Sequence, residues 1–349
     1  MRGGAERVLR ILADLFPDAP IYTLLYDERK LGERFPRERV RTSRLQRFAR
    51  LTTNHHWYLP FFPAAAEAWD FSAYDIVLSS SSAFAHGIIT NGAPRHLCYV
   101  HSPARYLWDR THEVLERAPL LSSTFHRLRT WDAEAAARPD RLLAASREVQ
   151  RRIELYWRRD SDVVHPPIDD AWFQAPLPSP TPRDTYLVVS TLAAYKRIEL
   201  AIEACARAGK RLTIVGEGPD RRRLQRLSGP TVTFLGYRPQ EEMAALYANA
   251  RATLFPGEED FGLVPIESMA CGTPVIAYRG GGALETLQEG TTGIFFDEPT
   301  GASLAHAIGT FEQTPFSPAA CRAHAVQFGR APFEHAILGH IEALLAAPH

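Results

Sequence analysis

The chain has few cysteines, three methionines, no excess charge of either sign and no long hydrophobic run. No apolar stretch reaches the roughly 18 residues that a membrane-spanning helix needs. The start, MRGGAERVLR, lacks the apolar core of a signal peptide. The four cysteines stand far apart, with no C-x-x-C pair and no metal-ligand spacing. They predict reduced, mostly buried thiols in a cytoplasmic protein: Cys98, Cys205, Cys271 and Cys321.

The charges balance, with 40 Lys and Arg against 40 Asp and Glu. A balanced chain has no overall attraction to nucleic acid or to an anionic membrane, so any such attraction must be local. Hydrophobic residues make up 45% of the 349, which is typical of a soluble globular protein. This length suits two domains.

The first half of the chain alternates strand-like and helix-like stretches, which predicts a parallel sheet covered on both faces. Examples are AERVLRILADLF (5–16), IYTLLYD (21–27), YDIVLSSSS (74–82), RHLCYVHS (95–102) and RPDRLLAASREVQRRIELYW (138–157). The proline-rich QAPLPSPTPRD follows, and then the alternation restarts from TYLVVST. We therefore expect an α/β fold with a first domain over 1–173, a linker over 174–183, a second doubly wound domain over 184–332 and a last helix over 333–349 that packs back toward the first domain. Ligands of parallel sheets bind at the carboxyl ends of the strands, so the site is expected between the domains.

The stretch EEDFGLVPIESMACGTPVIA (258–277) sets three acids before a Phe-Gly turn and another glutamate in the following helix. Pro265 suits the first helical position and places Glu267 in the first turn. Gly262 lets the backbone approach a ligand closely, and amides at a helix start attract phosphate. Carboxylates beside a phosphate would repel it unless they bind sugar hydroxyls or stabilise positive charge at an anomeric carbon. A solvated, purely structural loop is the alternative.

This stretch resembles the glutamate, seven residues, glutamate signature of the retaining glycosyltransferases of family 4, which have the GT-B fold. The matching pair is Glu259 and Glu267, with Phe261 and Gly262 between them. Further stretches resemble the same family in order and spacing: VVSTLAAYKRIELAIEA, LTIVGEGPDRRRL, VTFLGYRPQEEMAALYANARATLFPG and GGALETLQEGTTGIFF. The resemblance covers nearly the whole chain.

The resemblance implies roles for individual residues. Glu267 would hold the nucleotide ribose, Glu259 would face the donor sugar, and Lys196 would stabilise charge on the donor diphosphate. The rest of the expected donor-binding set is Gly3, Gly4, Arg197, Gly216, Tyr237, Phe261, Gly262 and Leu263. The family usually has an arginine in the place of Thr191, so Arg197 or another basic residue must compensate, or stabilisation of the leaving group is weaker. No cofactor and no metal ion is implied.

The first domain carries its own resemblance. RGGAERVL (2–9) resembles the family's glycine loop, and HLCYVHSPARYLWD (96–109) resembles the variant in bacterial O-antigen and exopolysaccharide mannosyltransferases. His101 would sit over the donor sugar. Three residues are expected on the acceptor side: Arg105, Trp108 and Asp109. Family members open with a strand that leads into the glycine loop. That strand is not found in this sequence, so the first sheet is expected to lack it. Either the true start lies upstream, or the first domain is impaired.

Residues 29–50 carry nine Lys and Arg against two Glu, and WYLPFFP follows at 57–63. A solvated face is one interpretation. The other is contact with an anionic bilayer, on the inner face of the cell membrane, or with the phosphates of a lipid-linked acceptor. Nucleic acid is not expected, because no nucleic-acid-binding motif accompanies the patch.

Together these features predict a retaining, metal-independent hexosyltransferase that moves mannose from GDP-mannose to a lipid-linked glycan in cell-surface polysaccharide assembly. Two alternatives stay open. One is an ADP- or UDP-glucose-dependent enzyme of the same fold. The other is a degenerate, non-catalytic protein that binds nucleotide sugars, which Thr191 and the absent strand would favour.

Overall fold

The computed structural model describes residues 4–48, 55–90, 94–112, 116, 121–178 and 183–347. They form two compact units, each described here by itself. The C-terminal unit comprises Pro166–Phe333, and the N-terminal unit comprises Arg2–His165 together with Glu334–His349. In the described ranges, no helix combines the length and the apolar character needed to cross a membrane.

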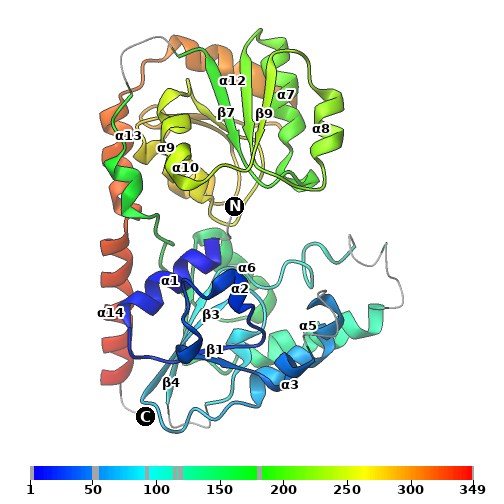
Figure 1. Ribbon diagram of the computed structural model, residues 1–349, viewed down its shortest axis with the longest axis vertical. Coiled ribbons are helices and arrows are strands. Elements are labelled where there is room, and N and C mark those ends of the chain that lie inside the picture. The colour runs from blue at the N-terminus through cyan, green and yellow to red at the C-terminus, as the bar shows by residue number, and fades with distance from the viewer. Residues whose placement is uncertain are drawn as a thin grey trace. The chain divides into compact units, whose positions relative to one another are not determined.

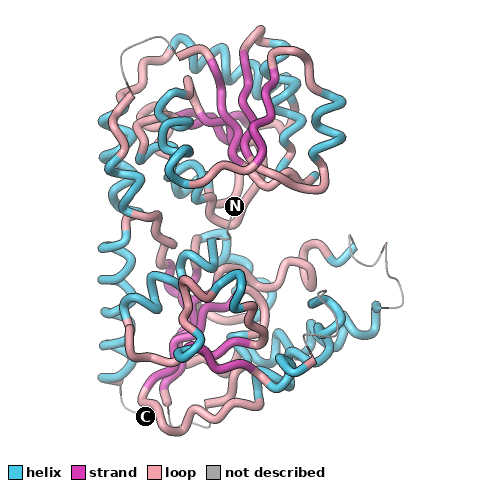
Figure 2. The backbone as a smooth tube through the Cα atoms, viewed as in Figure 1, coloured by secondary structure: helices cyan, strands magenta, loops and turns pink. Residues whose placement is uncertain are grey.

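The C-terminal unit is built on one six-stranded sheet, in which every pair of neighbouring strands is parallel (Figures 1 and 2). The strands are β7 (Thr185–Val189), β8 (Arg211–Val215), β9 (Val232–Gly236), β10 (Thr253–Phe255), β11 (Val275–Tyr278) and β12 (Gly293–Phe296). Their order is β12-β11-β10-β7-β8-β9. The chain therefore adds β8 and β9 on one side of β7, and then adds β10, β11 and β12 on the other side. The fold is therefore α/β, as the alternating sequence predicts.

Both faces of this sheet are buried, because successive side chains of a strand point to opposite faces. Leu187 and Val189 belong to one core cluster, and Tyr186 and Val188 belong to the other. The first cluster is covered by α9 (Gln240–Asn249), α10 (Leu263–Ala270) and α13 (Pro318–Ala325), and the second by α7 (Ile198–Arg207), α8 (Arg221–Leu227) and α12 (Gly301–Gln313). The shorter helices of this unit are η6 (Asp170–Gln174), η7 (Ala194–Lys196), α11 (Ala283–Thr286) and η8 (Val326–Phe328).

The described residues of the N-terminal unit form two separate sheets, and all neighbouring strands in them are parallel. The larger has the order β3-β4-β5-β6, from β3 (Ile76–Ser81), β4 (Arg95–Val100), β5 (Arg141–Ala144) and β6 (Asp162–Val163). The smaller pairs β1 (Ile21–Thr23) with β2 (Val40–Thr42). The short strand β2 is not among the sequence-based expectations, since three residues inside a basic segment carry no alternation.

Helices supply further residues to the core clusters of this unit. They are α1 (Gly4–Leu15), α2 (Glu28–Leu31), η1 (Arg37–Arg39), η2 (Arg44–Arg47), η3 (His55–Phe61), α3 (Phe62–Glu67), η4 (Ala85–Gly87), α5 (Ser122–Ala135), α6 (Arg147–Trp157) and α14 (Arg330–Ala346). Ser146 caps α6 by accepting a hydrogen bond from the Val149 amide at 3.0 Å, as its position before the helix predicts.

The division between the units differs from the expected linker at 174–183. It lies at 165/166, because the segment before the prolines packs in the C-terminal unit. Trp172 is 3% exposed in the core of that unit, and the Ile168 amide donates to the Phe328 carbonyl at 2.9 Å. At the end of the chain, residues 334–349 group with the N-terminal unit, where the His340 imidazole contacts Arg141 at 3.2 Å.

All four cysteines are free and buried, as their spacing predicts. The N-terminal unit also buries several titratable groups. Burial lowers the pKa of His86 to about 4 and that of His96 to about 3. His101 is similarly affected, with a pKa of about 4. Burial acts on Asp132 in the opposite direction and raises its pKa to about 6, although the carboxylate accepts hydrogen bonds from two indoles, Trp108 at 2.8 Å and Trp157 at 2.7 Å.

These shifts predict that the N-terminal unit loses stability in mild acid. Below pH 6.5 the unfolded histidines take up protons that the folded ones refuse, which costs about 1.4 kcal/mol per pH unit for each histidine. The raised pKa of Asp132 opposes this loss of stability. Its contribution to the free energy of unfolding is fully present in acid and is lost as pH rises through 6. We expect unfolding near pH 5 to take up about two protons net. Five of the six tryptophans lie in this unit, so fluorescence-detected urea unfolding at pH 5 and pH 7 measures the effect. Asp132→Asn should steepen the loss, and a flat profile would contradict the assignment.

One glycine of the C-terminal unit is required by its contacts. Gly216 follows β8 with φ at +130°, and a Cβ added there would lie 1.8 Å from the Ser190 carbonyl oxygen at the end of β7. Side chains rarely adopt this φ, and the backbone oxygen cannot move aside without displacing its strand end. Gly216 therefore lets the loops after β7 and β8 approach each other.

Comparing alanine substitutions at Gly216 and Gly209 separates the steric conflict at Gly216 from the strain of an unusual backbone conformation. Gly209 has φ at +65° and no atom within 4 Å of an added Cβ, so Gly209→Ala should cost only the strain of the left-handed region, about 1–2 kcal/mol. Gly216→Ala should lower Tm clearly more, because the strand ends must separate as well. Equal melting temperatures for the two variants would mean that the loops can adjust freely.

Candidate functional site

The loops that follow the strands of the C-terminal unit all emerge at one edge of its sheet, because the strands are parallel. The sheet order reverses between β7 and β10, and the loops after these two strands carry Lys196 and Glu259. Their side chains meet: Lys196 Nζ lies 2.5 Å from Glu259 Oε1, and both are largely shielded from solvent. Crevices at such a reversal are where open α/β sheets bind ligands. Two residues predicted separately for one site are thus in direct contact.

The backbone around Lys196 is held closely. A Cβ on Gly257 would come within 3.0 Å of the Lys196 carbonyl oxygen, so the loop before Glu259 lies against the one that carries the lysine. Arg197 takes a left-handed conformation, with φ at +51°, at the start of α7. Its guanidinium lies 5.7 Å from the Tyr278 ring centroid, in cation–π geometry, and its Nη1 is buried without a hydrogen-bond partner.

Helix α10 begins two residues earlier than the sequence indicates. Leu263 is its first residue and Gly262, with φ at +88°, is its N-cap, so Pro265 stands third. A Cβ on Gly262 would lie 3.0 Å from the Phe255 ring, which explains the glycine there. The Phe261 side chain is buried and packs edge-to-face on Phe328, 5.8 Å away. Phe261 can therefore meet a ligand only through its backbone.

Glu267 lies in the second turn of α10 and is 5% exposed. It accepts a hydrogen bond from the Tyr247 hydroxyl at 3.1 Å, and Tyr247 itself is fully buried on α9. A buried carboxylate needs such donors, because ionised groups are costly to bury unpaired. Sequence reasoning missed Tyr247, which stands 20 residues away on another helix. The only signal for it is an aromatic residue on the apolar face of that helix.

Three further residues of the C-terminal unit lie at the same edge of the sheet. Gly216 follows β8, and Tyr237, which is 52% exposed, follows β9. Thr191 follows β7 and is exposed. At Thr191, where the resemblance implies an arginine, the chain has only a small hydroxyl. Arg197, the residue expected to compensate, lies over an aromatic ring.

In the N-terminal unit, His101 follows β4 directly. Its Nε2 lies 2.8 Å from the Ser80 hydroxyl at the end of β3, and its ring contacts Tyr99 edge-to-face at 5.1 Å. The lowered pKa keeps the imidazole neutral at physiological pH, so it offers one donor and one acceptor. Ser80 was not predicted, although the run of serines that ends β3 could have indicated it.

The predicted acceptor-side residues belong to an internal polar network. Trp108 donates to Asp132 and stacks on Tyr156 at 4.8 Å, with an interplanar angle of 13°. Asp109 accepts from the Tyr156 hydroxyl and pairs with Arg152 at 2.9 Å. Arg105 lies 3.5 Å from the same carboxylate. These contacts give Trp108 and Asp109 a structural role, and their contact with an acceptor stays a prediction.

The remaining predicted residues lie at the start of the chain. Gly4 is the first residue of α1, and Gly3 lies outside the described residues. Among the residues that the structure describes, no group of three or more His, Cys, Asp or Glu side chains is arranged to hold a metal ion.

Comparison with known protein families covers both units. Residues 2–172 match the model described as Glycosyltransferase Family 4, and residues 171–328 match the model described as Glycosyl transferases group 1.

Several curated relatives align with part of the chain. A D-inositol 3-phosphate glycosyltransferase of Acidothermus cellulolyticus is 31% identical over 210 residues, which are 51% of this chain and 47% of the relative. A GDP-mannose-dependent alpha-(1-6)-phosphatidylinositol dimannoside mannosyltransferase of Mycobacterium tuberculosis is 35% identical over 144 residues, or 39% of this chain and 37% of that protein. The chain thus spans less than half the length of these relatives.

Solved structures share the fold over nearly the full chain. Anabaena HepE, solved in complex with UDP, superposes with a TM-score of 0.73 at 20% identity, covering 98% of this chain and 97% of its own. The lipopolysaccharide outer core galactosyltransferase WaaB superposes with a TM-score of 0.66 at 16% identity, over 98% of this chain and 96% of its own. With both family models matched in sequence order and the architecture shared, the chain carries the two domains of a family 4-type glycosyltransferase with the GT-B fold.

Proposed function

We propose that the protein is a retaining glycosyltransferase that moves mannose from GDP-mannose to a lipid-linked glycan in cell-surface polysaccharide assembly. The observation that carries the proposal is the contact between Lys196 and Glu259 where the sheet order reverses. Glu267 is buried on α10, the helix that follows Glu259 in the chain. A cation for a diphosphate and carboxylates for sugar hydroxyls are what a nucleotide-sugar donor requires. Relatives named as GDP-mannose-dependent support the choice of donor.

In this proposal the free protein holds Lys196 and Glu259 as a resting pair. An incoming diphosphate carries more negative charge than one carboxylate, so it displaces Glu259 from the ammonium group. Glu259 is then released toward the sugar, where its charge stabilises the oxocarbenium-like transition state at the anomeric carbon. Lys196 meanwhile stabilises the negative charge that develops on the departing nucleoside diphosphate, without a metal ion.

The proposed acceptor is supported by the basic stretch of the N-terminal unit. Six of its cationic residues are exposed: Arg29, Lys30, Arg37, Arg41, Arg44 and Arg47. Phe48 and Phe61 are more than half exposed in the same region of the chain. Cations with exposed aromatics suit an anionic membrane surface or the phosphates of a lipid-linked substrate. Arg39 has another role, because its guanidinium donates to the carbonyls of Ala13, Phe16 and Ala19.

A second candidate is a UDP-glucose-dependent transferase of the same fold. The observation that favours it is the shared architecture with HepE, which has been solved with UDP-glucose. A third candidate is a non-catalytic protein that binds nucleotide sugars. It is favoured by Thr191, which stands where the resemblance implies an arginine.

A donor panel tests these candidates. Purified protein is incubated with GDP-mannose, UDP-glucose and ADP-glucose, each labelled in the sugar, with and without a lipid extract of bacterial membranes as acceptor. We expect lipid-soluble label from GDP-mannose, in the presence of EDTA as well. Label from UDP-glucose alone would establish the second candidate, and nucleotide binding without hydrolysis or transfer of any donor would establish the third.

Substitutions at two neighbouring acids give this assay a test variant, Glu259→Gln, and a matched control, Glu258→Gln. Glu259→Gln should lower turnover by about a hundredfold or more, because it removes only charge near the reacting carbon. It should bind nucleoside diphosphate at least as tightly as the wild type, since Lys196 loses its competitor. Glu258→Gln changes an exposed acid one residue away and should leave turnover nearly unchanged. Unchanged turnover for Glu259→Gln would remove Glu259 from the mechanism.

Lys196→Ala should weaken binding of GDP far more than binding of guanosine. A hydrogen bond to a charged group contributes about 1.5–3 kcal/mol, which corresponds to roughly a 10- to 150-fold loss for GDP. Calorimetry with both ligands measures the difference. Lys210→Ala, which removes a surface lysine paired with Glu312, serves as the control and should change neither affinity. Equal losses for GDP and guanosine would place Lys196 away from the diphosphate.

A further inference from the structure

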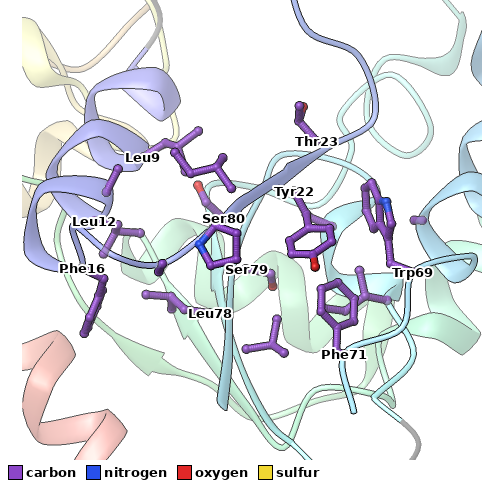
Figure 3. A pocket seen from close by; sticks show the side chains of 18 of the residues that line it. Leu9, Leu12, Phe16, Tyr22, Thr23, Trp69, Phe71, Leu78, Ser79 and Ser80 are labelled. Atoms are coloured by element: carbon purple, nitrogen blue, oxygen red, sulfur yellow. The ribbon is translucent and has the colours of Figure 1, made fainter. Parts of the chain in front are cut away.

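Two cavities of unlike character lie in the described parts of the chain. One of about 520 Å³ belongs to the N-terminal unit and has largely apolar walls, with Leu12 and Phe71 among its lining residues (Figure 3). Arg39 is the only charged residue of its described lining, and it is bonded to backbone carbonyls. The other cavity, of about 340 Å³, belongs to the C-terminal unit and is lined by two arginines, Arg183 and Arg251. This volume is enough for a small ligand.

The cavity with the two arginines lies at the edge of the sheet opposite the proposed donor site. Arg183 stands two residues before β7, and Arg251 stands two residues before β10. These neighbouring strands are parallel, so the residues that precede them lie at one edge, and the loops that follow them, with Lys196 and Glu259, lie at the other. The Arg251 amide also donates to the Thr185 carbonyl at 2.8 Å, which joins the starts of the two strands directly.

The two guanidinium groups line the same cavity and repel each other. Burial lowers the pKa of Arg183, and the nearby charge of Arg251 lowers it further. Arg183 Nη1 donates to the carbonyls of Ala248 and Ala250, at 3.4 and 2.8 Å, whereas its Nε and Nη2 make no hydrogen bond to another described residue. Arg251 Nη2 donates to Glu312 at 3.3 Å, and within the same described ranges its Nε and Nη1 make none. Each arginine therefore keeps N–H donors for a ligand.

The charges around this cavity do not balance. Glu312 is the one acidic residue of its described lining, and three donors hold its carboxylate at 2.6 to 3.3 Å: Tyr186, Lys210 and Arg251. Burial tends to raise the pKa of Glu312, but these partners outweigh burial and hold the pKa below its usual value. The carboxyl end of α12 adds about half a negative charge. Against these stand Arg183, Arg251 and Lys210, so an excess of about 1.5 positive charges remains.

The excess charge and the free donors indicate one class of ligand. A phosphate group carries close to two negative charges near neutral pH, and its oxygens accept paired hydrogen bonds from guanidinium groups. A single carboxylate would balance less of the charge. Another part of the lining is aromatic: Phe311 and Phe316 stack at 4.9 Å, and the Arg251 guanidinium lies over the Phe311 ring at 5.2 Å. This surface suits a ring attached to the phosphate.

We propose that the cavity before β7 and β10 binds a phosphate group between the guanidinium groups of Arg183 and Arg251. The ligand is inorganic phosphate or a small phosphate monoester, which share the same dianion. Bound there, the phosphate removes the repulsion between the two arginines and connects the starts of two strands whose following loops carry Lys196 and Glu259. The protein should therefore be more stable when phosphate is bound. The site lies apart from the proposed donor site, and the inference does not depend on the proposed function.

Calorimetric titration of the full chain tests the proposal with three probes: inorganic phosphate, phenyl phosphate and acetate. Ionic strength is held constant at about pH 8, where phosphate is a dianion. We expect saturable binding of phosphate and binding of acetate that is weaker by about tenfold or more. Phenyl phosphate that binds about fivefold more tightly than phosphate would identify a monoester as the ligand. Equal or weaker binding of phenyl phosphate would identify inorganic phosphate, and either result supports the site.

Arg251→Gln removes one arm of the site and should weaken phosphate binding by about tenfold or more. It leaves Glu312 paired with Lys210. Arg211→Gln is the matched control, because Arg211 begins β8 at the same edge, pairs with Asp184 at 3.4 Å and does not line the cavity. This control should change the affinity by less than about twofold. If Arg251→Gln is too unstable to measure, Arg251→Lys keeps the charge but loses the guanidinium fork, and should still weaken binding by about threefold or more.

Lys196→Ala separates this site from the proposed donor site. It should leave phosphate binding unchanged, because Lys196 lies at the other edge of the sheet. Loss of phosphate binding in Lys196→Ala, unchanged binding in Arg251→Gln, or equal affinity for acetate and phosphate would each overturn the proposal. Phosphate also stabilises proteins because it is excluded from their surface. A rise in Tm that does not saturate, and that is equal in the wild type and Arg251→Gln, would show exclusion alone and would likewise contradict a phosphate site.

Discussion

Pairing between β7 and β10 determines where the chemistry of the C-terminal unit lies. Leu187 and Thr253 stand opposite each other, and the Leu187 amide donates to the Ala252 carbonyl at 3.0 Å. Because both strands run in the same direction, their following loops must leave at the same edge. That single pairing brings a lysine and a glutamate 63 positions apart in sequence within 2.5 Å. The helices on both faces serve this arrangement by keeping the sheet dry and its register fixed.

Much of this could be predicted from the sequence, for physical reasons that differ by element. The alternation of apolar strands with amphipathic helices predicts the parallel sheets. The acids around Gly262 predict a donor site at this edge of the sheet, which stays a prediction. The contact between Tyr247 and Glu267 could not be predicted, because it depends on how two helices pack on one face of the sheet. The start of α10 was misplaced because proline is tolerated throughout the first turn, so its position marks the helix start only to within two residues.

The N-terminal unit shows the same limit in its polar core. Asp132 joins two tryptophans from different segments and stands 3.5 Å from His86, whose ring stacks on Trp157 at 4.5 Å. Of these residues, only Trp108 lies in a stretch that resembles a family motif. Trp108, predicted on the acceptor side, is held by this network, so any role toward an acceptor would depend on a carboxylate buried on α5. Burying Asp132 costs stability, which its two indole donors only partly offset.

The segments that form the proposed donor site carry more acidic than basic side chains. Four carboxylates, Glu258, Glu259, Asp260 and Glu267, belong to the loop and helix that form it, against two cations, Lys196 and Arg197. One cation is already paired with Glu259 and the other lies over an aromatic ring. With Thr191 in place of an arginine, side chains alone would leave a diphosphate in an acidic environment. The backbone amides at the start of α10 are then the natural further source of positive potential, because the first N–H groups of a helix have no partner within it. In the proposed donor site, the left-handed Gly262 therefore matters beside the lysine, because it shapes the turn that leads into these amides, and no side chain of the N-cap residue is bonded to them.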